Sequence, residues 1–300
     1  MHHQANNTVE SLADFLRIIK ERKKIEEKEL SQDTKEKSFF YRGQSNYSWT
    51  IKPSIFRKPE LHEKEEYITT ESMLRLESEF SRERTLFEKL VKMQHFGIPT
   101  RLLDVTTSPL TALFFACQEH ISDHQLQTDG MVFIWHLPFR DFPDTPTVVV
   151  KSHLSRLRKE EKDELKSVLK KYFGSIDNEF LDIKNGTLCS LIREKVIVKL
   201  TSFANQDIYL PKIILGGLNQ VNIVRPTWNN TRITAQQGWF MILGFEEIIE
   251  KLNERTIYQK IRIPASCKEN ILKELDYIGV NHLTLFPDLH GMSQYIKNRF

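Results

Sequence analysis

Apolar residues at helical spacing predict several helices along the chain. After Ser11, apolar side chains at residues 12, 15, 16 and 19 share one face, and Asp14 stands at capping-box spacing from Ser11. Ser108 and Pro109 predict another helix start, with serine as N-cap and proline at the first helical position. The residues that follow (LTALFFACQ) are apolar nearly all round, so we expect a buried helix. Further helices are predicted at 63–92, 154–172 and 266–277, with a final segment at 289–299.

Runs of aromatic and β-branched residues predict the strands. SFFYR at 38–42 ends at a glycine, and MVFIWHL at 131–137 has the composition of a buried strand. Further strands or extended pieces are predicted at 49–56, 102–105, 196–200, 231–243 and 256–263. Because helices and strands do not alternate regularly, we predict an α+β fold with mixed, mostly antiparallel sheets and peripheral helices. We divide the chain into an N-terminal helix and charged loop (1–37) and one globular unit (38–300).

Composition narrows the classes of protein. Of 300 residues, 40% are hydrophobic, and the 19 Phe argue against a disordered chain. No apolar run approaches the length of a membrane span, so we expect no membrane partner. The N-terminus lacks a secretory pattern and the 3 Cys form no C-x-x-C, which indicates a reducing, cytoplasmic location. With 43 basic against 40 acidic residues, charge alone does not indicate a nucleic-acid-binding protein.

The sequence lacks the common catalytic and metal-binding signatures. It contains no G-x-G-x-x-G, P-loop, H-E-x-x-H or G-x-S-x-G, and its histidines have no metal-ligand spacing, so we expect no metal.

Three polar clusters in apolar surroundings stand out instead. The first is Tyr41-Arg42-Gly43-Gln44. The planar fork of Arg42 suits a phosphate or carboxylate, and Gly43 would let a ligand approach the backbone. The alternative is a buried arginine paired with an internal carboxylate.

The second cluster spans residues 94–108 and ends at the buried helix. Thr106, Thr107 and Ser108 bring three hydroxyls to the helix N-terminus, where free N–H groups favour an anion. The alternative is that Ser108 only caps the helix. Arg101 and Asp104 in the same cluster are candidates for ligand contact or for an internal ion pair, and His95 for a ligand contact or a core histidine.

The third cluster is NTRITAQQGWF at 230–240. On a strand, Arg232 and Gln236 would share one face and Gln237 would lie on the other. Amides beside a glycine and an aromatic residue suit a purine or nicotinamide ring, because they offer paired donors and acceptors. The alternative is a polar edge strand.

Together with LFPDL at 285–289, these clusters resemble the bacterial FRG-domain family, named after a Phe-Arg-Gly motif in which Tyr41 here replaces the Phe. The resemblance runs from about residue 38 to 297. The family occurs in bacteria and phages, often near defence genes, and its biochemistry is mostly unassigned.

A second resemblance is to the arginine–serine–glutamate class of ADP-ribosyltransferases. Tyr41-Arg42-Gly43 resembles the first motif of that class, and Thr106-Thr107-Ser108 before an Ala- and Phe-rich helix resembles the second. The resemblance implies an ADP-ribosyltransferase-like core. It also implies that Arg42 contacts the phosphate or ribose of NAD, and that the hydroxyls brace a ribose or the Arg42 strand. Arg42, Thr106, Thr107 and Gln236 each carry a donor in an apolar segment, where an isolated polar group costs free energy, so we expect them to line one cleft.

The third motif of that class should carry a catalytic Glu, and this chain has Gln236 and Gln237 instead. A neutral amide offers no countercharge to the cationic ribose that forms when nicotinamide leaves. Either another carboxylate acts, such as Asp104, Glu246 or Glu247, or the site binds a nucleotide without turning it over. Three functions stay open: an NAD-using toxin or antiphage effector, a nucleotide- or nucleic-acid-sensing module, and a protein-interaction component. The acceptor and the oligomeric state are not indicated.

Overall fold

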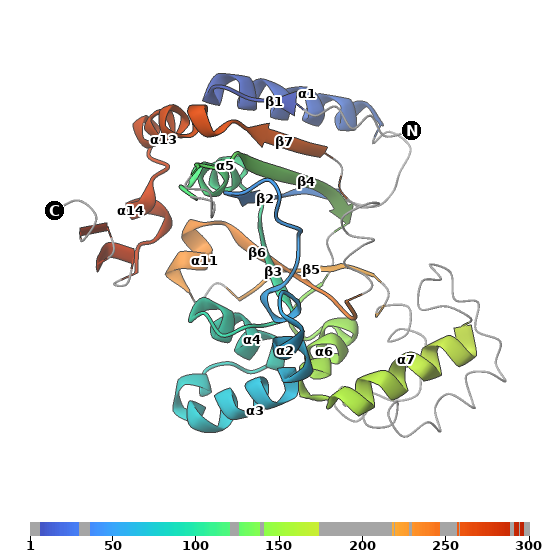
Figure 1. The fold of residues 1–300 in the computed structure, drawn as a ribbon. Coiled ribbons are helices and arrows are strands. Elements are labelled where there is room, and N and C mark those ends of the chain that lie inside the picture. The colour runs from blue at the N-terminus through green and yellow to red at the C-terminus, as the bar shows by residue number, and fades with distance from the viewer. Residues whose placement is uncertain are drawn as a thin grey trace.

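One mostly antiparallel sheet forms the centre of the molecule (Figure 1). The computed structural model describes residues 7–29, 37–120, 126–138, 141–173, 218, 220–227, 230–246, 257, 259–288, 291–293 and 295–296. Within them, the sheet has 7 strands in the order β1-β7-β4-β2-β3-β6-β5. The strands are β1 (Asn7–Thr8), β2 (Lys37–Gln44), β3 (Leu102–Thr106), β4 (Gly130–Pro138), β5 (Asn222–Val224), β6 (Gly238–Ile242) and β7 (Gln259–Ile263). Neighbouring strands are antiparallel except for the β1–β7 pair, so the predicted α+β class is confirmed.

Three helices pack on the β2–β4–β7 part of the sheet. They are α1 (Leu12–Glu29), α5 (Pro109–Cys117) and α13 (Lys268–Tyr277), and their apolar side chains share one core with β2, β4 and β7. Helix α5 lies so close to the sheet that a Cβ at Gly43 would meet the Ala112 carbonyl oxygen at 1.8 Å, and one at Gly130 would meet the Ala116 oxygen at 2.1 Å. The close approach expected at Gly43 is therefore made by the α5 backbone.

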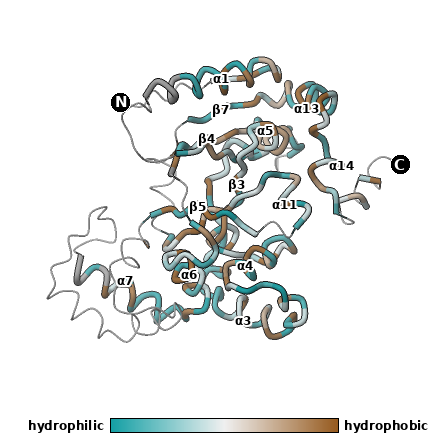
Figure 2. Tube along the Cα trace, turned by 180° about the vertical axis from the view of Figure 1, so that it is seen from behind, coloured by the Kyte–Doolittle hydropathy of each residue, from teal (hydrophilic) through white to brown (hydrophobic). Residues whose placement is uncertain are grey.

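Five further helices gather around the β5–β6 end of the sheet (Figure 1). They are α2 (Pro59–Glu63), α3 (Glu65–Arg75), α4 (Leu86–His95), α6 (Pro146–His153) and α7 (Lys159–Phe173). Two short helices, α11 (Thr231–Ala235) and α14 (His282–Leu285), contact each other, and α14 lies at the outer left side of the molecule in Figure 1. Figure 2 shows that α1 and α7 mix hydrophilic and hydrophobic residues, whereas β4 and α5 are mainly hydrophobic, as expected for central elements.

The helices predicted after Ser11 and Ser108 and the strands predicted at 38–42, 102–105 and 131–137 are confirmed. The predictions at 154–172, 256–263 and 266–277 are confirmed over most of their length by α7 (Lys159–Phe173), β7 (Gln259–Ile263) and α13 (Lys268–Tyr277). The Ser11 hydroxyl accepts from the Asp14 N–H at 3.2 Å, as a cap should. The predicted long helix at 63–92 is wrong, because a 3₁₀ turn (Glu77–Phe80) separates α3 from α4. The extended piece at 49–56 ends in another such turn (Ser54–Phe56). The strand predicted at 196–200 lies outside the described residues.

The strand predicted at 231–243 is half wrong. Its first part is the helix α11, because the Asn230 side chain accepts from the N–H groups of Arg232 and Ile233 at 2.9 and 3.3 Å and caps a helical turn. Gln237 then adopts a left-handed φ of 47° and ends the turn, and β6 begins at Gly238. The shared strand face expected for Arg232 and Gln236 is therefore wrong, because Arg232 lies in α11 and Gln236 directly follows it.

Candidate functional site

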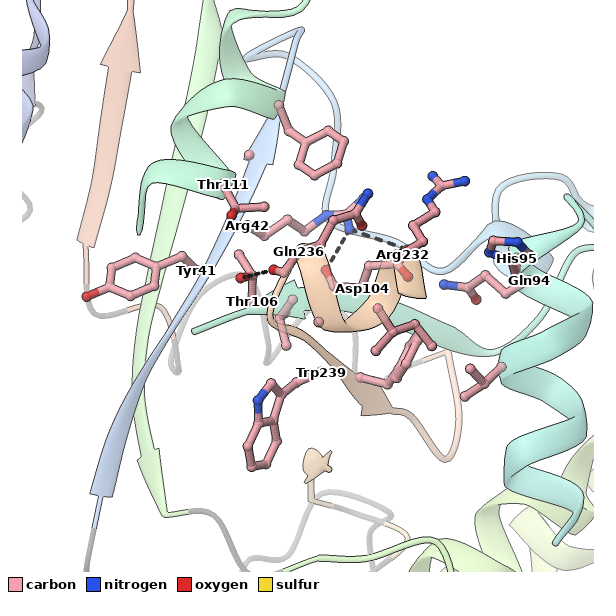
Figure 3. A pocket seen from close by; sticks show the side chains of 17 residues that line it. Tyr41, Arg42, Gln94, His95, Asp104, Thr106, Thr111, Arg232, Gln236 and Trp239 are labelled. Carbon is pink, nitrogen blue, oxygen red and sulfur yellow. Dashed lines mark hydrogen bonds and ion pairs between the residues drawn. The ribbon is translucent and has the colours of Figure 1, made fainter. Parts of the chain in front are cut away.

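The candidate site lies where β2 and β3 separate. Strand β2 pairs with β4 through 8 residue pairs but with β3 only through Tyr41 and Thr106. A cavity of about 280 Å³, which we call the β2–β3 cavity, opens beside this single pair (Figure 3). It brings together residues from all three sequence clusters. Of the predicted site residues, the cavity is lined by Tyr41, Arg42, Gly43, His95, Asp104, Thr106, Arg232 and Gln236.

Arg42 bridges the gap between the two strands. Its Nη1 donates to the backbone oxygen of Asp104 at 2.7 Å and lies 4.0 Å from the Asp104 carboxylate. The side chain is 15% exposed, and its buried Nε has no hydrogen-bond partner among the described residues. Burial lowers the pKa of Arg42, while the charge of Asp104 raises it. A cation held in this way, with donors left over, is suited to an anionic ligand.

Asp104 lies in the middle of β3 with its side chain 64% exposed. The predicted ion pair between Arg101 and Asp104 is wrong. Two residues three apart on an extended chain point to opposite faces, so their side chains cannot meet. The carboxylate of Asp104 therefore faces the β2–β3 cavity and solvent instead of bracing a turn.

Arg101 points away from the β2–β3 cavity into the interior. It is 1% exposed and binds Glu65 with two hydrogen bonds, of 2.8 and 2.6 Å. Its Nη1 donates to the carbonyl oxygens of Leu243 and Gly244 at 3.1 and 2.7 Å. Arg101 and Glu246 line a second cavity, and Glu247 lies outside the described residues.

The hydroxyl cluster holds the loop between β3 and α5 in place. Thr106 donates to the Gln236 carbonyl oxygen at 2.7 Å and accepts from the Ser108 N–H at 2.9 Å. Ser108 accepts from the Thr111 N–H at 3.2 Å, so the cap is confirmed. Thr107 contacts the Gln237 side chain at 3.4 Å. Thr106 lines the β2–β3 cavity, whereas Thr107, Ser108 and Gln237 do not appear in its wall.

Helix α11 forms the opposite wall of the cavity (Figure 3). The Gln236 amide donates to the Leu285 carbonyl oxygen at 3.0 Å, so one of its two N–H donors is already in use. The Arg232 guanidinium lies 4.6 Å from the centre of the Phe286 ring, a cation–π contact. The third cluster therefore contacts the LFPDL segment, and no spacing in the sequence predicts this contact.

Three residues of the wall, Val91, Thr111 and Phe115, lie outside the three clusters. Six more lie within the clusters but were not proposed as site residues: Gln94, Val105, Ile233, Gly238, Trp239 and Phe240. Most of these wall residues are apolar, and in the sequence they cannot be told apart from ordinary core residues. Gln44, which was a candidate, is 5% exposed and does not line the cavity. Its Oε1 is buried without a partner among the described residues.

The described residues offer no group of three His, Cys, Asp or Glu side chains that could hold a metal ion. Over the same residues, no helix combines the length and apolar character needed to cross a membrane.

Comparison with known proteins gives one match. The FRG domain family model matches residues 37–125, which include β2, α4, β3 and α5 and therefore Arg42, His95, Asp104 and Thr106. No curated protein and no solved structure matches the chain. The α11 wall lies outside the matched segment. The resemblance to the FRG domain is thus confirmed for residues 37–125.

Proposed function

We propose that the β2–β3 cavity binds NAD and that the chain cleaves it or transfers its ADP-ribose group. The observation that carries the proposal is Arg42, a largely buried cation with unused donors at the point where β2 and β3 part. In such a partly dehydrated position, a hydrogen bond to a charged phosphate is stronger than the same bond in water. The resemblance to ADP-ribosyltransferases gives Arg42 this role as well.

The dimensions of the site suit one half of a dinucleotide. A volume of about 280 Å³ is at the small end of ligand pockets. A smaller cavity of about 220 Å³ adjoins it and shares Val91, His95 and Ile233 with it. NAD would place one nucleotide in the β2–β3 cavity, with its phosphate near Arg42, and extend along α4 with the other. Apolar side chains such as Phe115, Ile233 and Phe240 offer contact area for a flat ring.

The reaction needs a negative charge near the ribose. When the bond between nicotinamide and ribose breaks, positive charge develops on the ribose, and water or an acceptor nucleophile bonds to the same carbon. Gln236 cannot supply the charge, because its side chain is a neutral amide. Of the described residues that line the cavity, Asp104 is the one carboxylate. We assign it this stabilising role.

A second candidate function is nucleotide binding without turnover. The position that should carry the catalytic Glu holds Gln236, and Asp104 lies 4.0 Å from Arg42, which offsets part of its charge. A binding module would use the same cavity to sense a nucleotide or a nucleic acid. As an enzyme, the chain would act as a toxin or antiphage effector, in line with the defence context of the family it resembles.

Two measurements on the wild-type chain test the proposal. Thermal unfolding with NAD, ADP-ribose or short nucleic acids reports ligand binding, because a ligand of the native state raises the melting temperature. Release of nicotinamide from NAD, with and without added protein or nucleic-acid acceptors, reports turnover. Stabilisation with nicotinamide release supports the enzyme, and stabilisation without release supports the binding module. If none of these ligands changes the melting temperature and no nicotinamide is released, both are wrong.

A further inference from the structure

A second cavity of about 270 Å³ lies beside α2 and α7, away from the proposed NAD site. We call it the α2–α7 cavity. Its walls come from the turn before α2, from α2 and α7, and from the residues just after β6. Within the described residues, no side chain lines both this cavity and the β2–β3 cavity. A ligand in one could therefore bind without touching the other.

The floor of the α2–α7 cavity holds two buried cations and one buried anion. Arg101 and Lys162 line it, with side chains 1% and 9% exposed. Both bind the carboxylate of Glu65, which is itself 1% exposed, and the Lys162 bond is 2.6 Å long. Burial lowers the pKa of Lys162, and the charge of Glu65 opposes that shift. One carboxylate cannot balance two cations, so the floor carries excess positive charge. Burying such a charge without a counter-ion destabilises the fold.

The rim adds further cations that are only loosely held. Lys52 pairs with Glu246 and Lys159 with Glu63, both at 2.5 Å, and all four side chains are partly or largely exposed. Ion pairs exposed to solvent contribute little to the stability of the fold. A phosphate that binds these lysines more strongly can therefore replace the carboxylates. Arg57, Lys166 and Asp163 also line the cavity. Among the described residues, the cationic side chains of the lining outnumber its carboxylates, even when the buried Glu65 carboxylate is added.

One side of the cavity is aromatic. The rings of Phe56 and His62 meet edge to face, with centroids 4.8 Å apart. Phe245 lies under Lys166, whose Nζ is 5.5 Å from the ring centre. Aromatic rings next to several cations suit a ligand that has both a flat ring and an anionic group.

We propose that the α2–α7 cavity is a binding site for a small phosphorylated ligand, with the phosphate bound by Lys52, Lys159 and Lys162. Phosphate satisfies the charge requirement, since its oxygens accept from several ammonium groups at once. Arg101 contributes mainly charge, because four of its five N–H donors are taken by Glu65 and two carbonyl oxygens. The site is independent of the proposed NAD reaction and does not need it to be correct.

Calorimetric titration with inorganic pyrophosphate and with AMP tests the site. The Arg42→Ala protein is used throughout, so that the β2–β3 cavity contributes little. We expect saturable binding at up to millimolar concentrations, and we expect Lys52→Gln with Lys159→Gln to weaken it by about tenfold or more. Lys58→Gln is the matched control, because Lys58 lies on the same segment but does not line the cavity. It should change the affinity by less than about twofold.

The outcomes are distinct. If AMP binds more tightly than pyrophosphate, the aromatic side holds a ring. If pyrophosphate binds as tightly, the site recognises the phosphate alone. The proposal is overturned if neither probe binds, or if the double variant, shown to be folded by its melting curve, binds as well as its parent. An equal loss in the Lys58→Gln control would also overturn it, because that loss indicates unspecific charge attraction.

Discussion

Arg42 and Arg101 are both arginines at strands of the same sheet, yet their surroundings differ. Arg101 uses its donors on Glu65 and two carbonyl oxygens, and it is closed off from solvent. Among the described residues, Arg42 makes one hydrogen bond, to a backbone oxygen, and its ion-pair partner is the Asp104 carboxylate at 4.0 Å. The first arginine is satisfied by the protein itself, and the second has donors left for a ligand.

The comparison shows that burial alone does not identify a ligand-binding arginine. What separates the two is whether the folded chain already supplies the partners that a guanidinium requires. Removing Arg101 should therefore harm mainly the fold, and removing Arg42 should harm mainly binding.

Arg101→Leu should lower the free energy of unfolding by about 3–5 kcal/mol, because it removes one partner from a buried ion pair. Chemical denaturation measures the loss. The control is Arg75→Leu, which removes an exposed arginine paired with Glu71 and should cost about 1 kcal/mol or less. A similar small loss for Arg101→Leu would show that the buried pair is not needed for stability.

Asp104→Asn should reduce NAD turnover about a hundredfold or more, the scale of a lost electrostatic stabiliser. The melting temperature and the affinity for ADP-ribose should stay nearly the same, since the carboxylate is 64% exposed. Steady-state nicotinamide release and calorimetry on one preparation give both values. Glu60→Gln, an exposed carboxylate on α2, is the control. Parallel losses of stability, binding and turnover would instead give Asp104 a structural role.

Ser108→Ala should cost about 1 kcal/mol of stability, because its hydroxyl caps α5. Thr107→Ala should cost less, since its hydroxyl makes one long contact of 3.4 Å to an exposed glutamine. Paired denaturation curves of the two variants measure the difference. Equal losses of stability in the two variants would mean that the hydroxyl cluster stabilises the loop as a whole, and that the helix cap has no special part in it.

The sequence predicts the elements whose signals are local. Ser108 and Pro109 mark the start of α5, and aromatic runs mark β2 and β4, because capping and strand preference depend on near neighbours. The start of α11 was not predicted, although Asn230 is a good N-cap. The alternation of polar and apolar residues after Asn230 is typical of a strand and favoured that prediction instead.

Contacts between distant residues could not be predicted in this way. The partner of Arg101 is Glu65, 36 positions away, and nothing in the spacing points to it. The apolar wall of the β2–β3 cavity looks like ordinary core in the sequence, since only the separation of β2 from β3 exposes it to a ligand. By contrast, Arg42, Thr106, Thr107 and Gln236 were expected in one cleft because each carries a donor in an apolar segment, and all but Thr107 line the β2–β3 cavity.

The account depends most on Arg42 as a phosphate-binding residue, and calorimetric titration with ADP-ribose tests this directly. ADP-ribose keeps both phosphates of NAD but has no nicotinamide to lose, so turnover does not disturb the measurement. We predict that Arg42→Ala keeps the wild-type fold and weakens binding by at least about tenfold, because a hydrogen bond to a charged group contributes about 1.5–3 kcal/mol. Arg42→Lys should restore little of the loss, since lysine lacks the bidentate fork. Unchanged affinity in folded Arg42→Ala protein would contradict the account.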